Sequence, residues 1–200
     1  MQSIGIVGVV LCGGESRRMG IDKGDINYHG MAQREYVLNM LRPLTSLAVY
    51  SCGNQAEDLE IAFPDLPDLA GHGPLSGLLS VHRAFPDKDL LLVGCDYPLL
   101  QVHHLETILN QETDKQAICY QSGSPARPEP LITLYRVPIL KRIDQQFNET
   151  GEDSLRRYLK DADTLYLEMD NPLSFISADR PEDVSRVRQL LQEGFATFDA

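Results

Sequence analysis

An apolar run that leads directly into a glycine-rich polar loop is the feature that most constrains the fold of this chain. Residues 4–11 are continuously apolar or glycine, which is typical of a central parallel strand buried on both faces. The loop over residues 12–24 begins with Cys12, Gly13 and Gly14, where glycines let the backbone approach a ligand. Ligands of open parallel sheets bind at the carboxyl ends of the strands. The run therefore predicts a ligand-binding loop at that edge.

Strands and helices alternate along the first 120 residues. Further strands are expected at 47–50, 89–94 and 117–120, and helices at 35–44, 75–85 and 103–110. The remainder predicts a loop at 125–130, strands at 131–135 and 165–167, and helices at 137–147, 153–159 and 182–191. This order predicts an α/β fold, a Rossmann-related three-layer sandwich with a mostly parallel central sheet, formed by residues 1–200 as a single domain.

The charge balance limits the classes of partner. With 18 Lys and Arg against 29 Asp and Glu, the net charge is -11, which argues against binding to nucleic acid or to a membrane surface. An anionic substrate must then be held by backbone N–H groups, a few placed cations and a metal ion. The four cysteines are scattered, which favours free thiols in a reducing compartment. The apolar start is too short to span a membrane, so a cytoplasmic location is expected.

The loop carries cations suited to a triphosphate. Arg17, Arg18 and Lys23 follow the paired glycines in an otherwise acidic chain. No Gly-Lys-Ser/Thr follows those glycines, so the loop is not a Walker P-loop, and it does not spell the dinucleotide-binding Gly-x-Gly-x-x-Gly. The residues alone thus predict a phosphate-binding loop, with a basic surface turn as the alternative.

Asp96 directly follows the apolar strand at 89–94 and should emerge at the same sheet edge as the loop. A carboxylate there can hold Mg²⁺ while the ion retains waters and binds phosphate oxygens. A helix-capping role is the structural alternative.

Five segments in order resemble one known family, the molybdenum cofactor guanylyltransferases of the nucleotidyltransferase superfamily, whose sheet is glycosyltransferase-A-like. These segments are residues 11–23, 73–78, 95–98, 130–131 and 134–136. The resemblance implies Mg²⁺-dependent transfer of GMP from GTP to the terminal phosphate of molybdenum-molybdopterin, with release of pyrophosphate. The pair Gly13-Gly14 favours the guanylyl over the cytidylyl branch. Cys12 stands where the family usually has alanine.

The resemblance also implies roles for particular residues. Those expected to bind nucleotide are Leu11, Cys12, Gly13, Gly14, Lys23, Asp68 and Asp96. Those expected to be catalytic are Arg18, Lys23 and Asp96, with Asp96 also the metal ligand. Asp65 is a rival for the role of Asp68, and Ser51 or Asn54 could replace a family asparagine.

The acceptor side departs from the family pattern. Residues 175–183 keep the family's frame but replace its two asparagines and its threonine, which introduces Asp179 and Arg180. Glu129 stands where many members have histidine. Two alternatives remain open: a related nucleotidyltransferase that uses CTP or a sugar-phosphate acceptor, and a nucleotide-binding regulator without turnover. Contact with other cofactor-synthesis proteins is an expectation by analogy alone.

The histidines complete the candidate set. His72 adjoins the Gly-Pro-Leu turn and is placed to touch substrate, whereas His103 and His104 are expected on a solvated helix face. No cysteine or carboxylate lies near them at ligand spacing, so the sequence does not predict a zinc site.

Overall fold

The computed structural model describes residues 3–12, 22–53, 59, 61–123 and 127–195. Its strands are β1 (Ser3–Leu11), β2 (Thr45–Ser51), β3 (Ala62–Phe63), β4 (Asp89–Gly94), β5 (Ala117–Ser122), β6 (Arg127–Tyr135) and β7 (Thr164–Glu168). Its helices are η1 (Lys23–Asp25), α1 (Gln33–Leu41), α2 (Pro74–Ala84), α3 (Val102–Leu109), α4 (Val137–Thr150), α5 (Leu155–Asp161), η3 (Pro172–Phe175) and α6 (Pro181–Gln192), with η marking short 3₁₀ turns. None of the helices in these ranges is long and apolar enough to cross a membrane.

The seven strands form one sheet in the order β3-β2-β1-β4-β6-β5-β7. Only β6 runs antiparallel to its neighbours β4 and β5; the other pairs are parallel. The mostly parallel sheet is therefore confirmed. At its centre β1 lies between β2 and β4, with both faces of the strand buried, as its continuous apolar run predicts.

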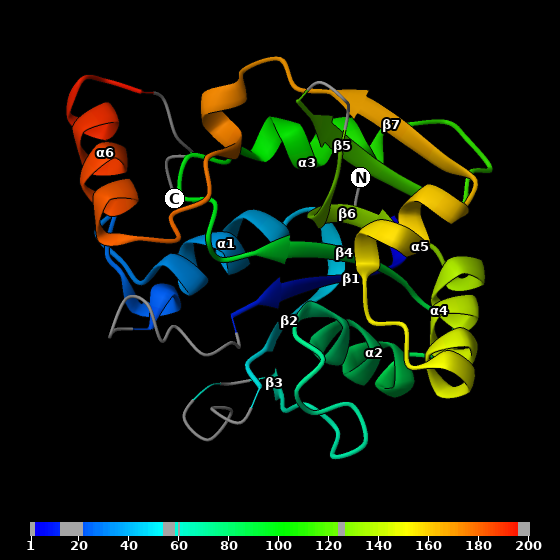
Figure 1. Cartoon of the computed structure of the whole chain (residues 1–200). Coiled ribbons are helices and arrows are strands. Elements are labelled where there is room, and N and C mark those ends of the chain that lie inside the picture. Colours follow the sequence, from blue (N-terminus) through cyan, green and yellow to red (C-terminus); the bar gives the residue numbers. More distant parts are fainter. Residues whose placement is uncertain (1–2, 13–21, 54–58, 60, 124–126, 196–200) are drawn as a thin grey trace.

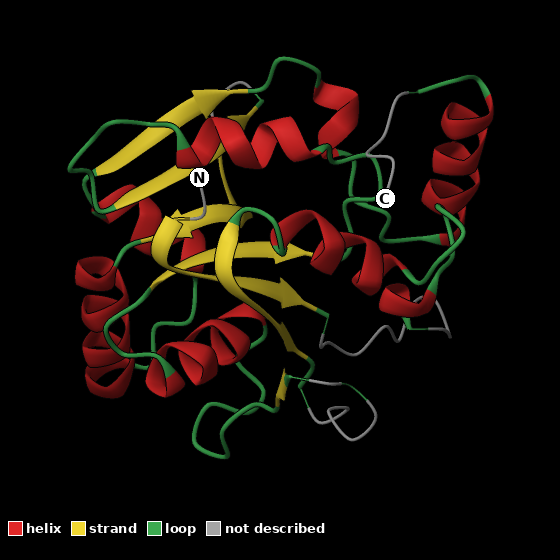
Figure 2. Ribbon diagram, turned by 180° about the vertical axis from the view of Figure 1, so that it is seen from behind, coloured by secondary structure: helices red, strands yellow, loops and turns green. Residues whose placement is uncertain are grey.

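Helices cover both faces of the sheet and make three layers (Figures 1 and 2). On one face α1 and α3 pack in a core with alternate residues of the strands, such as Val10 and Leu91. On the other face α2, α4 and α5 pack against the residues between them, such as Val9 and Leu92. Helix α6 stands at the edge of the molecule, where Val184 joins a small cluster with Ile26 and Ala178 (Figure 1).

Two sequence-based expectations are wrong. The segment 125–130 was expected to be a loop because it contains three prolines, yet β6 begins at Arg127. Pro128 and Pro130 are buried in this strand, where the carbonyls of Pro128 and Pro130 accept hydrogen bonds from Arg156 and Tyr135. Prolines are tolerated where the strand does not need their missing N–H. The second error concerns His104, which is buried rather than solvated, at 1% exposure.

Candidate active site at the carboxyl edge of the sheet

The carboxyl ends of β1, β2 and β4 are tied together by backbone hydrogen bonds. The amide of Cys12 donates to the carbonyl of Ser51 at 2.9 Å, and the amide of Cys95 donates to that of Leu11 at 3.1 Å. These bonds continue the sheet one residue past each strand and fix where the glycine loop leaves β1. Leu11 and Cys12 are both buried at this edge.

Helix α2 comes unusually close to these strand ends. A Cβ atom on Gly77 would lie 2.4 Å from both Leu11 Cδ1 and Ser51 Oγ, which no real side chain tolerates without a shift. Glycine therefore lets the first turns of α2 approach the point where the loop begins. Ser51 is fully buried, and its Oγ has no hydrogen-bond partner among the described residues.

Cys12 and Cys52 form a buried thiol pair at the carboxyl ends of β1 and β2. Their Sγ atoms lie 3.1 Å apart, and the hydrogen bond to Cys52, with burial, raises the pKa of Cys12 well above its usual range. Cys12 is therefore a neutral thiol at physiological pH. All four cysteines are buried and free, as expected for this chain.

Asp96 emerges from β4 and is held by the segment that precedes α6. Its backbone carbonyl accepts from the amide of Ala178 at 2.8 Å, and its Oδ2 accepts from Ser177 Oγ at 3.0 Å. Its Oδ1 is buried and has no hydrogen-bond partner among the described residues. The carboxyl lies over Gly94, because a Cβ there would come within 2.5 Å of that oxygen.

The environment of Asp96 disfavours its charge. Burial raises its pKa to about 6, while the nearby Lys23 ammonium and the Ser177 hydrogen bond act in the opposite direction. A half-buried carboxylate with an oxygen that no described residue binds is suited to a cation, because a cation would offset the cost of burying the charge.

Lys23 reaches the same place from the far end of the glycine loop. It begins η1, which Asp22 caps by accepting from the amide of Gly24 at 2.8 Å. The Lys23 ammonium forms an ion pair with Asp179 and is 22% exposed. Since Ser177 binds Asp96 and Asp179 binds Lys23, one short segment contacts two of the three residues predicted to be catalytic. The sequence signal for Asp22 was its place in the loop motif, but its capping role was not predicted.

A cavity of about 360 Å³ opens beside Asp96. Its lining comes from five parts of the chain: Pro74, Asp96, Tyr97, Glu129, Pro130, Leu131, Asp153, Ser154, Leu155, Arg156, Phe175, Ser177 and Asp179. Glu129 Oε1 is also buried without a hydrogen-bond partner among the described residues, and Arg156 lies 3.7 Å from the other oxygen. Sequence reasoning missed Arg156 and Ser177, because neither stands out without its spatial neighbours.

Other predicted residues lie elsewhere or outside the described ranges. Asp68 is 59% exposed and pairs with Arg83 of α2, which lowers the pKa of the carboxyl. Asp65 is half-buried, and burial raises its pKa. His72 contacts Asp153 at 3.3 Å. Arg180 occupies the N-cap position of α6, where its amide donates to Asp183 Oδ2 at 2.9 Å, and its side chain is exposed. Four predictions fall outside the described residues: Gly13, Gly14, Arg18 and the rival Asn54, as does Arg17.

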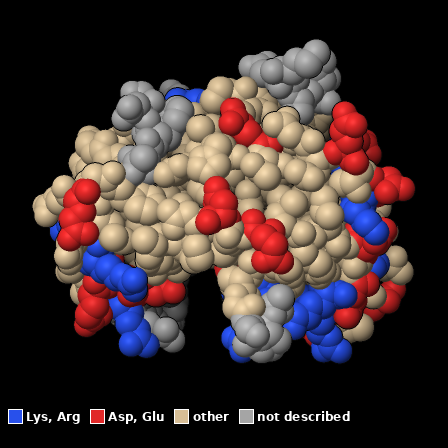
Figure 3. All heavy atoms as spheres, turned by 90° about the horizontal axis from the view of Figure 1, so that it is seen from above, with Lys and Arg blue, Asp and Glu red and all other residues tan. Residues whose placement is uncertain are grey.

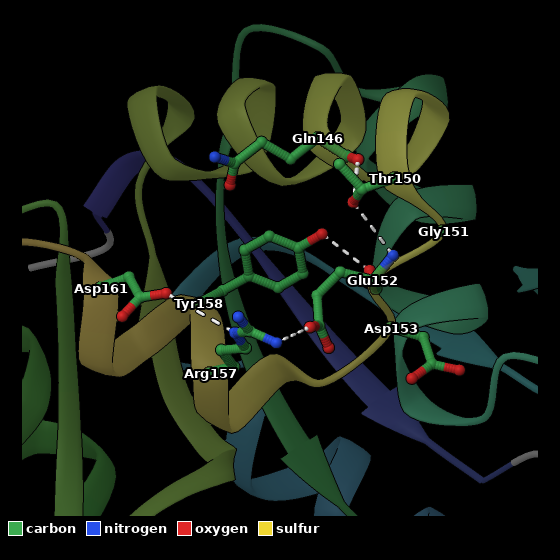
Figure 4. Close-up of a pocket in the computed structure, with 8 residues that line it drawn as sticks. All are labelled: Gln146, Thr150, Gly151, Glu152, Asp153, Arg157, Tyr158 and Asp161. Carbon is green, nitrogen blue, oxygen red and sulfur yellow. Dashed lines mark hydrogen bonds and ion pairs between the residues drawn. The ribbon is translucent and has the colours of Figure 1, made fainter.

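A second cavity, of about 540 Å³, lies between α4 and α5, away from Lys23 and Asp96. Figure 4 shows Arg157 and Tyr158 directed toward Glu152, whose carboxylate and backbone carbonyl they bind at 2.6 and 2.7 Å. The polar groups drawn there largely pair with one another. The cavity beside Asp96 is therefore the candidate active site.

The face seen from above carries acidic side chains over its centre, and basic ones gather toward its edges (Figure 3). With a net charge of -11, the chain must hold a phosphorylated substrate by local donors rather than by a broad positive field. A mostly parallel sheet with a carboxylate just past the end of β4 fits an enzyme that binds a nucleotide, and the family match of residues 8–165 gives the protein class: this chain is a nucleotidyltransferase.

Comparison with known proteins gives the family. Residues 8–165 match the MobA-like NTP transferase domain, and the chain belongs to that family. It is 27% identical over 199 residues to a molybdenum cofactor guanylyltransferase of Shewanella sediminis, covering 97% of this chain and 99% of the relative. It is also 27% identical over 187 residues to a molybdenum cofactor biosynthesis bifunctional protein of Synechocystis, covering 91% of this chain but only 53% of that protein.

The fold has solved counterparts. A molybdopterin-guanine dinucleotide biosynthesis protein A from Archaeoglobus fulgidus superposes with a TM-score of 0.77 at 22% identity, covering 94% of this chain and 99% of that one. At this identity the likeness bears on the fold alone, and it confirms the predicted architecture.

Proposed function

We propose that this chain transfers GMP from GTP to the terminal phosphate of molybdenum-molybdopterin and releases pyrophosphate, as one domain over residues 1–200. The observation that carries the proposal is the convergence of Lys23 and Asp96 on residues 177–179. The names of the full-length relatives support guanylyl transfer, and the paired glycines Gly13 and Gly14 support GTP over CTP.

The nucleotide half of the site would be the edge formed by β1, β2 and α2. Leu11 would pack at the base of the nucleotide site, while the Cys12 carbonyl and the backbone of Gly13 and Gly14 would bind the base and phosphates, because the Leu11 carbonyl and the Cys12 amide are already bonded within the sheet. Asp68 would bind the nucleotide only after its ion pair with Arg83 opens or turns. The loop that contains Asp68 would therefore rearrange on binding.

Asp96 fits a magnesium ion, because Oδ1 is buried and has no hydrogen-bond partner among the described residues. Magnesium prefers carboxylate oxygens and retains several waters. When bound, it would supply charge neutralisation at the phosphates. Ser177 would keep the carboxyl in place through Oδ2, which leaves the other oxygen for the ion.

In the reaction an oxygen of the acceptor phosphate attacks the α-phosphorus of GTP. A new P–O–P bond forms, the bond between the α-phosphorus and the bridging oxygen breaks, and the electron pair leaves with pyrophosphate. Lys23 and Arg18 would stabilise the negative charge that develops on the transferred and leaving groups. No general base is required, because the attacking phosphate oxygen is already ionised. For Lys23 to act, its pairing with Asp179 must yield to substrate phosphate.

The acceptor would occupy the cavity beside Asp96. Glu129 offers a carboxylate that can pair with the N–H edge of a pterin ring, and Arg156 offers a guanidinium for a phosphate. Glu129 belongs to β6 and Arg156 to α5. Both therefore follow Asp96 in the sequence, whereas the glycine loop precedes it. The replacement of the family histidine by Glu129 is thus compatible with a pterin acceptor.

The test is pyrophosphate release from each of four nucleoside triphosphates, with and without molybdenum-molybdopterin. Asp96→Ala and Lys23→Ala should each lower turnover by about 10²-fold, near 2.7 kcal/mol in the barrier. Lys141→Ala, on the exposed side of α4, is the control and should retain wild-type turnover. Near wild-type rates in both site variants, or turnover that requires a sugar phosphate, would refute the proposal.

A further inference from the structure

A histidine pair and an acidic residue from a distant segment meet at the start of α3. His103 Nε2 lies 3.2 Å from one carboxylate oxygen of Asp170, and His104 Nε2 lies 3.1 Å from the other. One ligand atom from each of the three side chains lies within 4.8 Å of the other two. Asp170 follows β7, so the sequence separates it from the histidines by more than sixty residues.

This arrangement has the spacing of a metal site. Bonds of about 2.0–2.2 Å to zinc would place tetrahedral ligands roughly 3.5 Å apart, close to the separations found here. His103 and Asp170 are 47% and 61% exposed, so water can enter and occupy the remaining coordination position. His104 is 1% exposed and fixes one ligand rigidly from inside.

The surroundings orient two of the ligands. His104 Nδ1 accepts from the Gln101 amide at 3.1 Å and lies 3.2 Å from the carbonyl of the same residue. A cation at Nε2 requires the tautomer in which Nδ1 carries the proton and donates to that carbonyl. Asp170 Oδ1 accepts from the amide of Asn171 at 2.7 Å, which limits rotation of the carboxyl. His104 also packs edge-on against Phe175, with ring centroids 4.9 Å apart.

We propose that His103, His104 and Asp170 form a binding site for a first-row divalent cation of the zinc type. Imidazole nitrogens favour zinc, nickel or copper over magnesium, which prefers oxygen. The site therefore differs in chemistry from the carboxylate Asp96, and the two would take different ions.

The cation would act as a clamp. Figures 1 and 2 place the segment after β7 beside the start of α3, and this segment continues through η3 to Ser177. We call residues 170–179 the arm. Since Ser177 of the arm binds Asp96, a cation at Asp170 would fix the arm and thereby the position of the Asp96 carboxyl. The cation is structural, and it participates in no bond that the reaction forms or breaks.

The experiment is zinc titration of tag-free, chelator-treated protein by calorimetry, with excess Mg²⁺ present to occupy oxygen sites. We expect one zinc per chain and a higher unfolding temperature, because the ion binds the native state. His103→Ala and Asp170→Asn should each weaken zinc binding by about 100-fold and abolish the thermal shift. His103 is preferred to the buried His104, whose loss would damage the core.

His72→Ala is the matched control, because His72 also contacts an exposed carboxylate, Asp153, and should leave zinc binding unchanged. Cobalt in place of zinc identifies the ligands, since a thiolate site such as Cys12 and Cys52 gives an intense sulfur-to-metal band in the near ultraviolet. Absence of zinc binding, retention of full affinity in both site variants, or a thiolate band would overturn the proposal.

Discussion

At the scale of single residues, the main feature of the candidate site is the Asp96 carboxylate, whose hydrogen bonding by the described residues is incomplete. Asp96 has one oxygen paired with Ser177 and one buried without a partner among the described residues. Burial raises its pKa to about 6, above the usual value of 3.8. The folded protein thus bears an electrostatic cost that a bound cation and substrate would offset, a common property of functional sites.

Because of this electrostatic cost, we expect Asp96→Asn to raise the free energy of unfolding when no metal ion is bound. A raised carboxyl pKa means that the cost is absent below pH 3.8, grows as pH rises and is complete above about pH 6. Urea denaturation in chelator at pH 7.5 should show the variant to be more stable by up to about 3 kcal/mol. The difference in free energy of unfolding between the variant and the wild type should be smaller at pH 5.5. An equal difference at both pH values would contradict a raised pKa of Asp96.

At the scale of elements, α2 packs closely on β1 and β2 at the proposed nucleotide-binding edge of the sheet. Gly77 permits a helix-to-strand approach that any side chain would prevent. This contact explains a glycine in the interior of a helix, where glycine costs about 1 kcal/mol relative to alanine. The approach places the start of α2 beside the end of β1.

Gly77→Ala should lower the free energy of unfolding by about 1–3 kcal/mol, because its Cβ would overlap Leu11 and Ser51. Adding Ser51→Ala removes one of the two overlapping atoms and should recover part of the loss. Ser51→Ala alone should be nearly neutral, since its Oγ is buried without a hydrogen-bond partner among the described residues. Urea titrations of the four proteins give the coupling, and additive effects would show that the overlap is not the cause.

At the scale of the whole molecule, the arm formed by residues 170–179 connects separate parts of the fold at the candidate active site. It contacts α3 through Asp170 and Phe175, β4 through Ser177, and η1 through Asp179. These contacts join the C-terminal part of the chain to residues between Lys23 and His104.

Ligand binding should consequently stabilise the entire fold. GTP with Mg²⁺ at about 100 times its dissociation constant adds about 2.7 kcal/mol, which corresponds to a rise of roughly 5–10 °C in Tm. CTP, UTP and ATP at the same concentration should raise Tm less, as differential scanning fluorimetry can measure. A larger rise with CTP would contradict the guanylyl assignment while leaving the nucleotidyltransferase class intact.

The sequence by itself determined the layered α/β fold and the strand-end position of Asp96. These follow from local patterns: a continuous apolar run predicts a buried parallel strand, and a polar residue directly after it must lie at the sheet edge. The β6 strand through Pro128 and Pro130 was not predictable in this way, because local proline content indicates a loop and only the neighbouring strands permit the extended conformation.

Only the tertiary structure decided which distant residues meet. Ser177 reaches Asp96 across 81 residues, Asp179 reaches Lys23 across 156, and Asp170 reaches His104 across 66. No periodicity encodes such contacts, because they depend on how the chain returns after β7 and not on the local preference of any segment. The burial of His104 has the same cause, because Phe175 from residues 170–179 packs against this face of α3 and excludes water from it.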